Sequence, residues 1–280
     1  MIKHTQILIC AYACEPNKGS EPEVGWQWAT SLAEHFPVTV VTRSNNEVSI
    51  KQATPMTKFP LSFEYIEVGK FGLFLKKLFK RFHIAKGLYN SSWQRKASKF
   101  ISKLNKDNKF SVIHHITLAS YRYPFAVTGH NAISIIGPIG GIEIFPYQLL
   151  PKKQLSVMMR EGIRNVFTDS KLLNYFIFKR IKKADYVFSS TKQMNEECLS
   201  RGIHSTCYPT IGVSSSFESH TSETLTEKDS FLFVGNISYL KGLEILFHAM
   251  ATLPPHIKLT MIGTTIAESK SLLDLVSELG

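Results

Sequence analysis

The chain opens with an apolar run, a glycine-containing loop, a helical pattern and a second apolar run, and this order constrains the fold most strongly. Ile7–Tyr12 is continuously apolar, which is typical of a strand buried on both faces. Ser20 and Glu23 have the spacing of a capping box at a helix start. Val38–Thr42 is the second apolar run. A strand, a helix and a second strand form a right-handed βαβ unit, so the sequence predicts the α/β class with a parallel sheet.

Gly19 lies between the first strand and the helix, at the carboxyl end of that strand. Ligands of parallel sheets bind at these ends, so the loop is a candidate binding site. It lacks the glycine fingerprint of dinucleotide sites, and Thr42-Arg43 stands where an acidic residue would follow the second strand, so NAD is not expected. Two alternatives remain open: Gly19 allows a ligand to approach the backbone, or it serves the turn alone.

The strand-and-helix pattern continues, stops at a polar segment, and then starts again. We predict a first Rossmann-like domain over 1–213, a linker over 214–229 and the start of a second Rossmann-like domain over 230–280. The second domain would have two parallel strands, which cannot bury both faces of their sheet. It is therefore expected to be incomplete, with the rest in a longer protein or supplied by a partner, or else to be loosely ordered.

The charge of the chain limits its partners. Its formal net charge is +11, which favours nucleic acid, anionic lipid or a phosphorylated small molecule. No helix-turn-helix, RNP-like or zinc signature supports nucleic acid. The four cysteines form no Cys-x-x-Cys pair and no cluster with histidine at zinc spacing, so we expect reduced, mostly buried thiols, a cytoplasmic protein and no metal. No apolar run approaches the ~20 residues that cross a bilayer.

Lys70–Lys103 holds ten Lys or Arg residues and no Asp or Glu. Its first part predicts a basic amphipathic helix with large aromatic side chains on the apolar face, which is typical of a helix lying on an anionic membrane. The alternative is that this face packs on the sheet. The predicted membrane contacts are Phe74, Lys76, Lys77, Phe79, Lys80 and Arg81.

A histidine pair and two later loops are the other candidate sites. His114 and His115 end a predicted strand and point to opposite faces, so one can face the core and the other a cleft. We favour His115 for function, because it is nearer the strand end and Thr117 shares its face; a purely structural role is the alternative. Gly140 and Gly141 follow another strand and either line a pocket or form a tight turn.

In the second domain, Val234-Gly235-Asn236 is followed by Lys241-Gly242 just before a predicted helix. A lysine beside a helix N-terminus can bind a diphosphate. The alternative is an ordinary surface lysine.

These motifs together resemble the family-4 glycosyltransferases of the GT-B type. The segments that carry the resemblance are Ala13–Trp26, His114–Thr117, Arg122–Pro124, Gly137–Gly141, Ile211–Val213 and Val234–Gly242. The resemblance implies two Rossmann-like domains across a cleft, an acceptor in the first, a nucleotide-sugar in the second, and transfer with retention and without a metal or other cofactor. It also implies catalytic roles for His115 and His114. Implied donor-binding residues are Gly19, Ser20, Asn236, Lys241 and Gly242, and implied acceptor-side residues are Glu21, Thr117, Gly140 and Gly141.

The chain departs from the family pattern at two points. Asn236 stands where the family usually has Arg, which provides a fixed charge and a bidentate fork. The Glu-x7-Glu motif that binds the donor lies beyond Gly280. We therefore expect a hexosyl-type glycosyltransferase, or the first two-thirds of one. It would act on a glycan or lipid-linked acceptor in cell-surface polysaccharide synthesis, at the inner face of the membrane. The alternative is a non-catalytic remnant that binds acceptor or membrane without donor chemistry.

Overall fold

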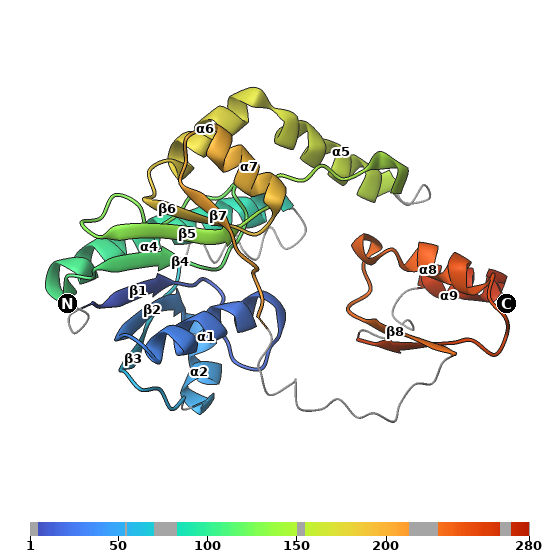
Figure 1. The fold of residues 1–280 in the computed structure, drawn as a ribbon, viewed down its shortest axis with the longest axis horizontal. Coiled ribbons are helices and arrows are strands. Elements are labelled where there is room, and N and C mark those ends of the chain that lie inside the picture. Colours follow the sequence, from blue (N-terminus) through green and yellow to red (C-terminus); the bar gives the residue numbers. More distant parts are fainter. Residues whose placement is uncertain are drawn as a thin grey trace. The chain divides into compact units, whose positions relative to one another are not determined.

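The computed structural model describes residues 5–53, 55–69, 83–149, 155–212, 229–263 and 270–279 (Figure 1). The chain divides into two compact units. The first contains Met1–Ile144 and Arg164–Gly212, and the second contains Phe145–Ile163 and Val213–Gly280. The predicted basic helix with its six membrane contacts lies outside the described residues, and so does the predicted linker apart from Asp229.

A seven-stranded sheet forms the centre of the first unit, in the order β3-β2-β1-β4-β5-β6-β7. Every neighbouring pair is parallel, which confirms the predicted α/β class. The strands are β1 (Ile7–Cys10), β2 (Val38–Arg43), β3 (Leu61–Ile66), β4 (Val112–His115), β5 (Ile133–Ile139), β6 (Tyr186–Ser189) and β7 (Ser205–Cys207).

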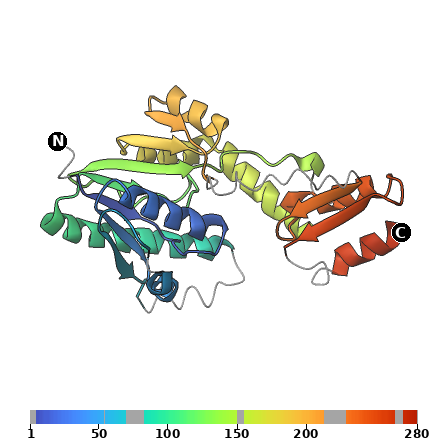
Figure 2. The same ribbon diagram turned by 60° about the horizontal axis from the view of Figure 1, so that its bottom comes forward.

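Helices cover both faces of this sheet, as Figures 1 and 2 show for α1 and α4. On β1, Ile7 and Ile9 pack with α1 and α2, whereas Leu8 and Cys10 belong to the core that contains α4, α6 and α7. None of the described helices has the length and apolar composition needed to cross a bilayer. The helices up to residue 212 are α1 (Ser20–Ala33), α2 (Glu47–Ala53), α4 (His83–Asn108), α5 (Leu155–Asp169), α6 (Lys171–Ile181) and α7 (Lys192–Ser200), with short 3-10 turns at Ser44–Asn46 and Tyr147–Leu149.

The second unit contains a parallel pair, β8 (Ser230–Val234) and β9 (Lys258–Ile262), with α8 (Leu243–Met250) and α9 (Lys270–Leu279). Phe233, Leu259 and Met261 face the helices and pack on their buried residues. The side chains that alternate with them remain exposed, with fractions of 63% for Leu232, 64% for Val234 and 55% for Ile262. Among the described residues one face of this sheet is therefore uncovered, as expected for two parallel strands.

Three local expectations are wrong. The polar segment Arg43–Pro60 predicts a loop, but it contains α2, whose single buried apolar residue, Ile50, leaves little apolar periodicity to detect. The apolar run Ala132–Ile136 predicts a strand that stops before Gly137, but β5 continues to Ile139 through a cis Gly137–Pro138 bond.

The third concerns the capping box of α1, which does not form. Gly19 occupies the N-cap position, and no side chain caps the helix. Ser20 is the first helical residue, with a φ of 53°. The Glu23 carboxylate instead accepts a hydrogen bond from Gln27, one turn further along the helix.

The close contact between α1 and the loop after β1 gives a stability prediction. A Cβ on Gly25 would lie 2.1 Å from the carbonyl oxygen of Ala13. We expect Gly25→Ala to lower the free energy of unfolding by about 1–3 kcal/mol, because backbone has to move. Gly87, in α4, is the matched control: its Cβ would meet Tyr123 at an ordinary 3.8 Å. Gly87→Ala should raise stability by about 0.5–1 kcal/mol. Urea unfolding measures both, and equal effects would contradict the packing argument.

Candidate functional site

Four loops leave the carboxyl ends of β1, β4, β5 and β6, and hydrogen bonds join them. We call residues 11–19, 116–122, 140–143 and 190–191 the carboxyl-edge loops. All four belong to the first unit. They surround the position where ligands of parallel sheets bind.

The loop after β1 is tied to its neighbours by two sets of bonds. The backbone N–H of Ala13 donates to the Thr117 hydroxyl at 2.9 Å. The buried Glu15 carboxylate accepts from Lys18 at 2.6 Å and from Ser49 at 3.2 Å. Thr117 thus has a structural partner, and Glu15, which sequence reasoning did not single out, holds the loop. Its burial in a charged loop was not detectable from spacing alone.

Gly19 lies at the exposed tip of this loop. Its φ of 63° and ψ of 177° suit glycine and strain other residues. No atom lies within 4 Å of the position that a Cβ would occupy. The turn requirement is thus supported, and the backbone is also open to a ligand, so the donor-binding role of Gly19 and Ser20 stays a prediction.

Glu21 links α1 to the loop after β4. One carboxylate oxygen accepts hydrogen bonds from the backbone N–H groups of Leu118, at 2.6 Å, and Ala119, at 3.2 Å. Leu118 has a φ of 63°, which is uncommon for a residue with a side chain. Glu21 lies in the first turn of α1, and its carboxylate also holds a neighbouring loop in a strained conformation.

The glycines after β5 allow the remaining loops to meet. The Gly140 N–H donates to the Ala119 carbonyl at 2.8 Å, and the Tyr121 N–H donates to the Gly140 carbonyl at 3.1 Å. A Cβ on Gly140 would stand 2.2 Å from the Ser190 hydroxyl. Gly141 has a φ of 96°. Both glycines are therefore required by local packing and backbone conformation, which supports the turn alternative.

The Glu143 carboxylate joins the same glycine loop to the one after β6. It accepts from the Gly141 N–H at 3.1 Å and from the Thr191 hydroxyl at 2.6 Å. With these bonds, the carboxyl-edge loops form one connected network across β1, β4, β5 and β6.

His114 and His115 point to opposite faces of the sheet, as predicted. The His114 ring meets Trp28 of α1 edge to face at 5.0 Å, and its Nε2 bonds the Gly137 carbonyl at 2.9 Å. The His115 ring meets Phe125 edge to face at 5.0 Å. Neither ring nitrogen of His115 makes a hydrogen bond of normal geometry within the described residues.

The expectation that one histidine opens to a cleft is not met. The exposed fractions are 3% for His114 and 0% for His115. Burial lowers the pKa of His114 to about 4. Burial also lowers the pKa of His115 to about 3, against a smaller opposing effect of the Leu118 backbone. Both rings are therefore neutral near pH 7, able to hydrogen bond but not to supply a proton. Their catalytic role stays a prediction.

In the second unit, Lys241 lies at the carboxyl end of β8. Its Cε stands 3.8 Å from the position of a Cβ on Gly235, the residue that follows the strand. Gly242, with a φ of 67°, is the N-cap of α8. Lys241 and Asn236 are exposed. A lysine beside a helix N-terminus is suited to an anion, as the sequence predicted. Gly19 and Lys241 belong to different units, and a shared crevice stays a prediction.

The described residues offer little for nucleophilic or metal chemistry at these loops. Burial raises the pKa of Cys14 to about 12, so the thiol is protonated at neutral pH. Three of the four cysteines are buried, as expected, and Cys207 is exposed. No group of three His, Cys, Asp or Glu residues is arranged to hold a metal ion in the part of the chain that the structure describes.

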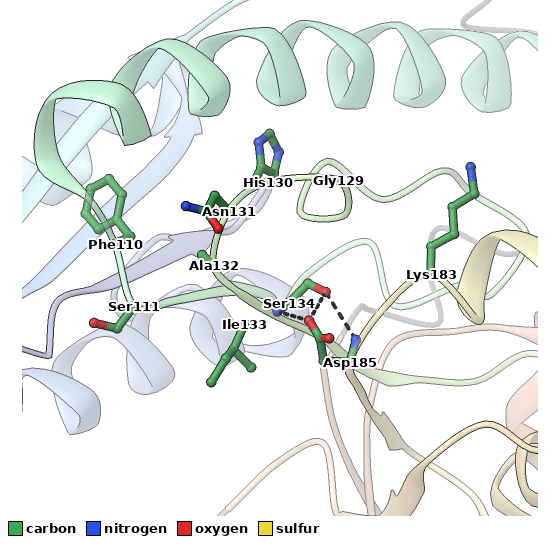
Figure 3. A pocket seen from close by; sticks show the side chains of 10 residues that line it. All are labelled: Phe110, Ser111, Gly129, His130, Asn131, Ala132, Ile133, Ser134, Lys183 and Asp185. Atoms are coloured by element: carbon green, nitrogen blue, oxygen red, sulfur yellow. Dashed lines mark hydrogen bonds between the residues drawn. The ribbon is translucent and has the colours of Figure 1, made fainter.

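An open cavity of about 530 Å³ lies at the other end of the sheet, near the amino ends of β4, β5 and β6 (Figure 3). The Asp185 carboxylate in its wall accepts from the backbone and hydroxyl of Ser134, both at 2.7 Å. These bonds lower the pKa of Asp185 and join β5 to β6. We assign this cavity no function, because its carboxylate is used in joining strands.

Comparison with known proteins supports the fold. No family model matches the chain, and no curated protein matches it. Sucrose-phosphate synthase from Thermosynechococcus elongatus has a similar structure, with a TM-score of 0.56 and 14% identity over 98% of this chain and 68% of that one. This likeness confirms the predicted GT-B-like class: two Rossmann-like domains with parallel sheets, the second with two strands among the described residues.

Two plant proteins are also similar, with lower scores. UGT73P12 of Glycyrrhiza uralensis, complexed with glycyrrhetinic acid 3-O-monoglucuronide, has a TM-score of 0.47 and 12% identity over 98% of this chain and 66% of that one. UGT71G1 of Medicago truncatula, complexed with UDP-glucose, has a TM-score of 0.45 and 11% identity over 98% and 71%. The chain thus spans about two thirds of the length of the structures that it matches.

The Glu21 bonds give a prediction about the network. Glu21→Ala should lower the free energy of unfolding by about 1.5–3 kcal/mol, because two buried N–H groups lose a charged acceptor. Glu21→Gln keeps an acceptor and should cost less. The exposed Glu34→Ala, just after the same helix, is the control. Urea unfolding compares the three variants, and a Glu21→Ala effect no larger than that of Glu34→Ala would refute the role of Glu21.

The histidine pKa values give a pH prediction. Below about pH 6.5 both histidines are protonated in the unfolded chain but remain neutral in the native chain. The free energy of unfolding should therefore fall as the pH drops toward about 4. His115→Leu should flatten this slope by about 1.4 kcal/mol per pH unit. Ile113→Val, a buried change on the same strand, should alter the stability but not its slope. An unchanged slope in His115→Leu would show that His115 is protonated in the native protein.

Proposed function

We propose that the chain is a glycosyltransferase, or part of one, that moves a hexosyl group from a nucleotide-sugar to a glycan or lipid-linked acceptor with retention. The observation that carries the proposal is the position of Lys241 beside Gly235 and the N-terminus of α8. A cation and a helix dipole at the end of a parallel strand are suited to a diphosphate. The fold shared with sucrose-phosphate synthase and the family-4 motifs support it.

In this proposal the chain contributes electrostatics and positioning. Lys241 and the α8 N-terminus stabilise negative charge on the departing nucleoside diphosphate, which replaces the need for a metal ion. The exposed backbone of Gly19 approaches the donor, and the acceptor lies on the carboxyl-edge loops that carry Glu21, Thr117, Gly140 and Gly141. His115, neutral and fully buried beneath those loops, would support the loops that bind the transferred sugar.

The acceptor class follows from the charge of the chain. The net charge of +11 suits a phosphorylated or membrane-associated acceptor. We propose action at the inner face of the membrane, in the synthesis of a cell-surface polysaccharide, with the protein bound peripherally and without nucleic acid as a partner.

A second candidate function is a binding protein without donor chemistry. Asn236 supports it, because an amide provides neither the charge nor the bidentate fork of the arginine usual in the family. The uncovered face of the β8–β9 sheet also supports it, because a donor site in this unit lacks a second packed layer among the described residues.

Calorimetric titration with UDP- and GDP-sugars separates the two candidates. We expect the full chain to bind one nucleotide-sugar, and Lys241→Ala to weaken binding about 10- to 150-fold, corresponding to about 1.5–3 kcal/mol for a charged hydrogen bond. Lys258→Ala is the control, an exposed lysine at the amino end of β9. Absence of heat with every nucleotide-sugar would favour the binding protein, and equal effects of the two substitutions would remove Lys241 from the site.

A further inference from the structure

Helix α5 has its polar and apolar faces reversed relative to an ordinary surface helix. Glu161, Asn165 and Thr168 are buried along one side of it. Large apolar side chains on the opposite side face solvent, with exposed fractions between 37% and 69%. A surface helix of a globular protein normally buries its apolar face. The exposed apolar residues of α5 are Leu155, Met158, Met159, Ile163, Val166 and Phe167.

Helix α6 continues the pattern. Asn174, Phe178 and Ile181 are buried on its inner side, where the Asn174 amide oxygen accepts a hydrogen bond from the Tyr121 hydroxyl at 3.2 Å. Its outer side exposes further apolar side chains. We define the α5–α6 face as the exposed apolar residues that lie in the first unit: Val166, Phe167, Leu172, Leu173, Tyr175 and Phe176. Isolated exposed apolar residues are common, but a consecutive group on two helices marks an interaction surface.

The charge around this face is predominantly positive. Between residues 164 and 183 the sequence contains six Lys or Arg residues and a single acid, Asp169. Lys171, Lys179, Lys182 and Lys183 are exposed. Arg180 is used within the unit, because its guanidinium donates to the Arg122 carbonyl at 3.1 Å. Lys182 donates to the Arg201 carbonyl at 3.4 Å, and Lys183 lines the cavity near the amino ends of the strands. Lys171 and Lys179 thus accompany the six apolar side chains.

The apolar and positively charged composition of the α5–α6 face favours an anionic bilayer over a second copy of the chain as its partner. A second copy of the chain, related by a two-fold axis, would place the same lysines opposite one another, and like charges would repel. An anionic bilayer instead attracts each lysine to its headgroups while the apolar side chains enter the interface. Tyr175 and Phe176 are of the type that is favoured at that depth.

We propose that the α5–α6 face docks on an anionic lipid bilayer. It lies on the membrane and does not span it, with the six apolar side chains below the headgroups and the lysines among them. This surface is separate from the predicted basic helix before α4, and its action does not depend on donor chemistry. It would hold the first unit beside a lipid-linked acceptor.

Vesicle flotation of the full chain tests the proposal. We expect flotation with phosphatidylcholine vesicles that contain phosphatidylglycerol and none with phosphatidylcholine alone. The double variant Lys171→Glu with Lys179→Glu should weaken binding at least about thirtyfold, because each lysine near such a surface is worth about 1 kcal/mol. Leu172→Ser with Phe176→Ser should weaken it even at low salt. All four positions are exposed, so the variants should fold.

Matched changes elsewhere in the first unit are the controls. Lys51→Glu with Lys58→Glu changes the net charge equally, and Val48→Ser with Met56→Ser removes two exposed apolar side chains. Both should float like the unmodified chain. The proposal fails if these controls weaken flotation as much as the α5–α6 variants, or if only charge reversal at Lys76, Lys77, Lys80 and Arg81 abolishes it. It also fails if the face instead forms a dimer in size-exclusion chromatography and no vesicle binding is found.

Discussion

The burial of β1 on both faces is the constraint on which the rest of the first unit depends. Its four side chains alternate between two cores, so α1 and α2 must cover one face while α4, α6 and α7 cover the other. Covering both faces requires parallel strands with helical crossovers, and parallel strands end at a common edge. The carboxyl-edge loops meet for this reason, and their hydrogen bonds then fix loops that are far apart in the sequence.

Elements with strong apolar periodicity were predictable, and contacts between distant residues were not. Strands β1 and β8 follow continuous apolar runs. In contrast, α2 buries one apolar residue and escaped detection. The Glu21 bond to Leu118 joins residues 97 positions apart, so no local pattern reports it. The capping box failed for a local reason, because the Glu23 carboxylate accepts a hydrogen bond from Gln27 on the same helix.

For the histidine pair, strand alternation predicts which face of the sheet each side chain is on but not whether that side chain is exposed. Strand periodicity correctly placed His114 and His115 on opposite faces, since successive side chains point apart. It did not show what covers each face. Trp28 of α1 covers His114, and Phe125 covers His115, so both rings are desolvated and neutral. Exposure is decided by helices and loops far along the chain, and a site inferred from one strand end therefore needs those neighbours.

The basic side chains near the candidate sites differ between the two units: those of the first are paired with a carboxylate, and that of the second is exposed. In the first unit, Lys18 and Arg43 both lie against the Glu15 carboxylate, at 2.6 Å and 4.0 Å, so the glycine loop carries little free positive charge. That loop can offer a ligand its exposed backbone at Gly19 rather than a side-chain charge. In the second unit Lys241 is exposed beside a helix N-terminus. Exposed backbone at Gly19 and exposed positive charge at Lys241 are therefore separate features of the two units.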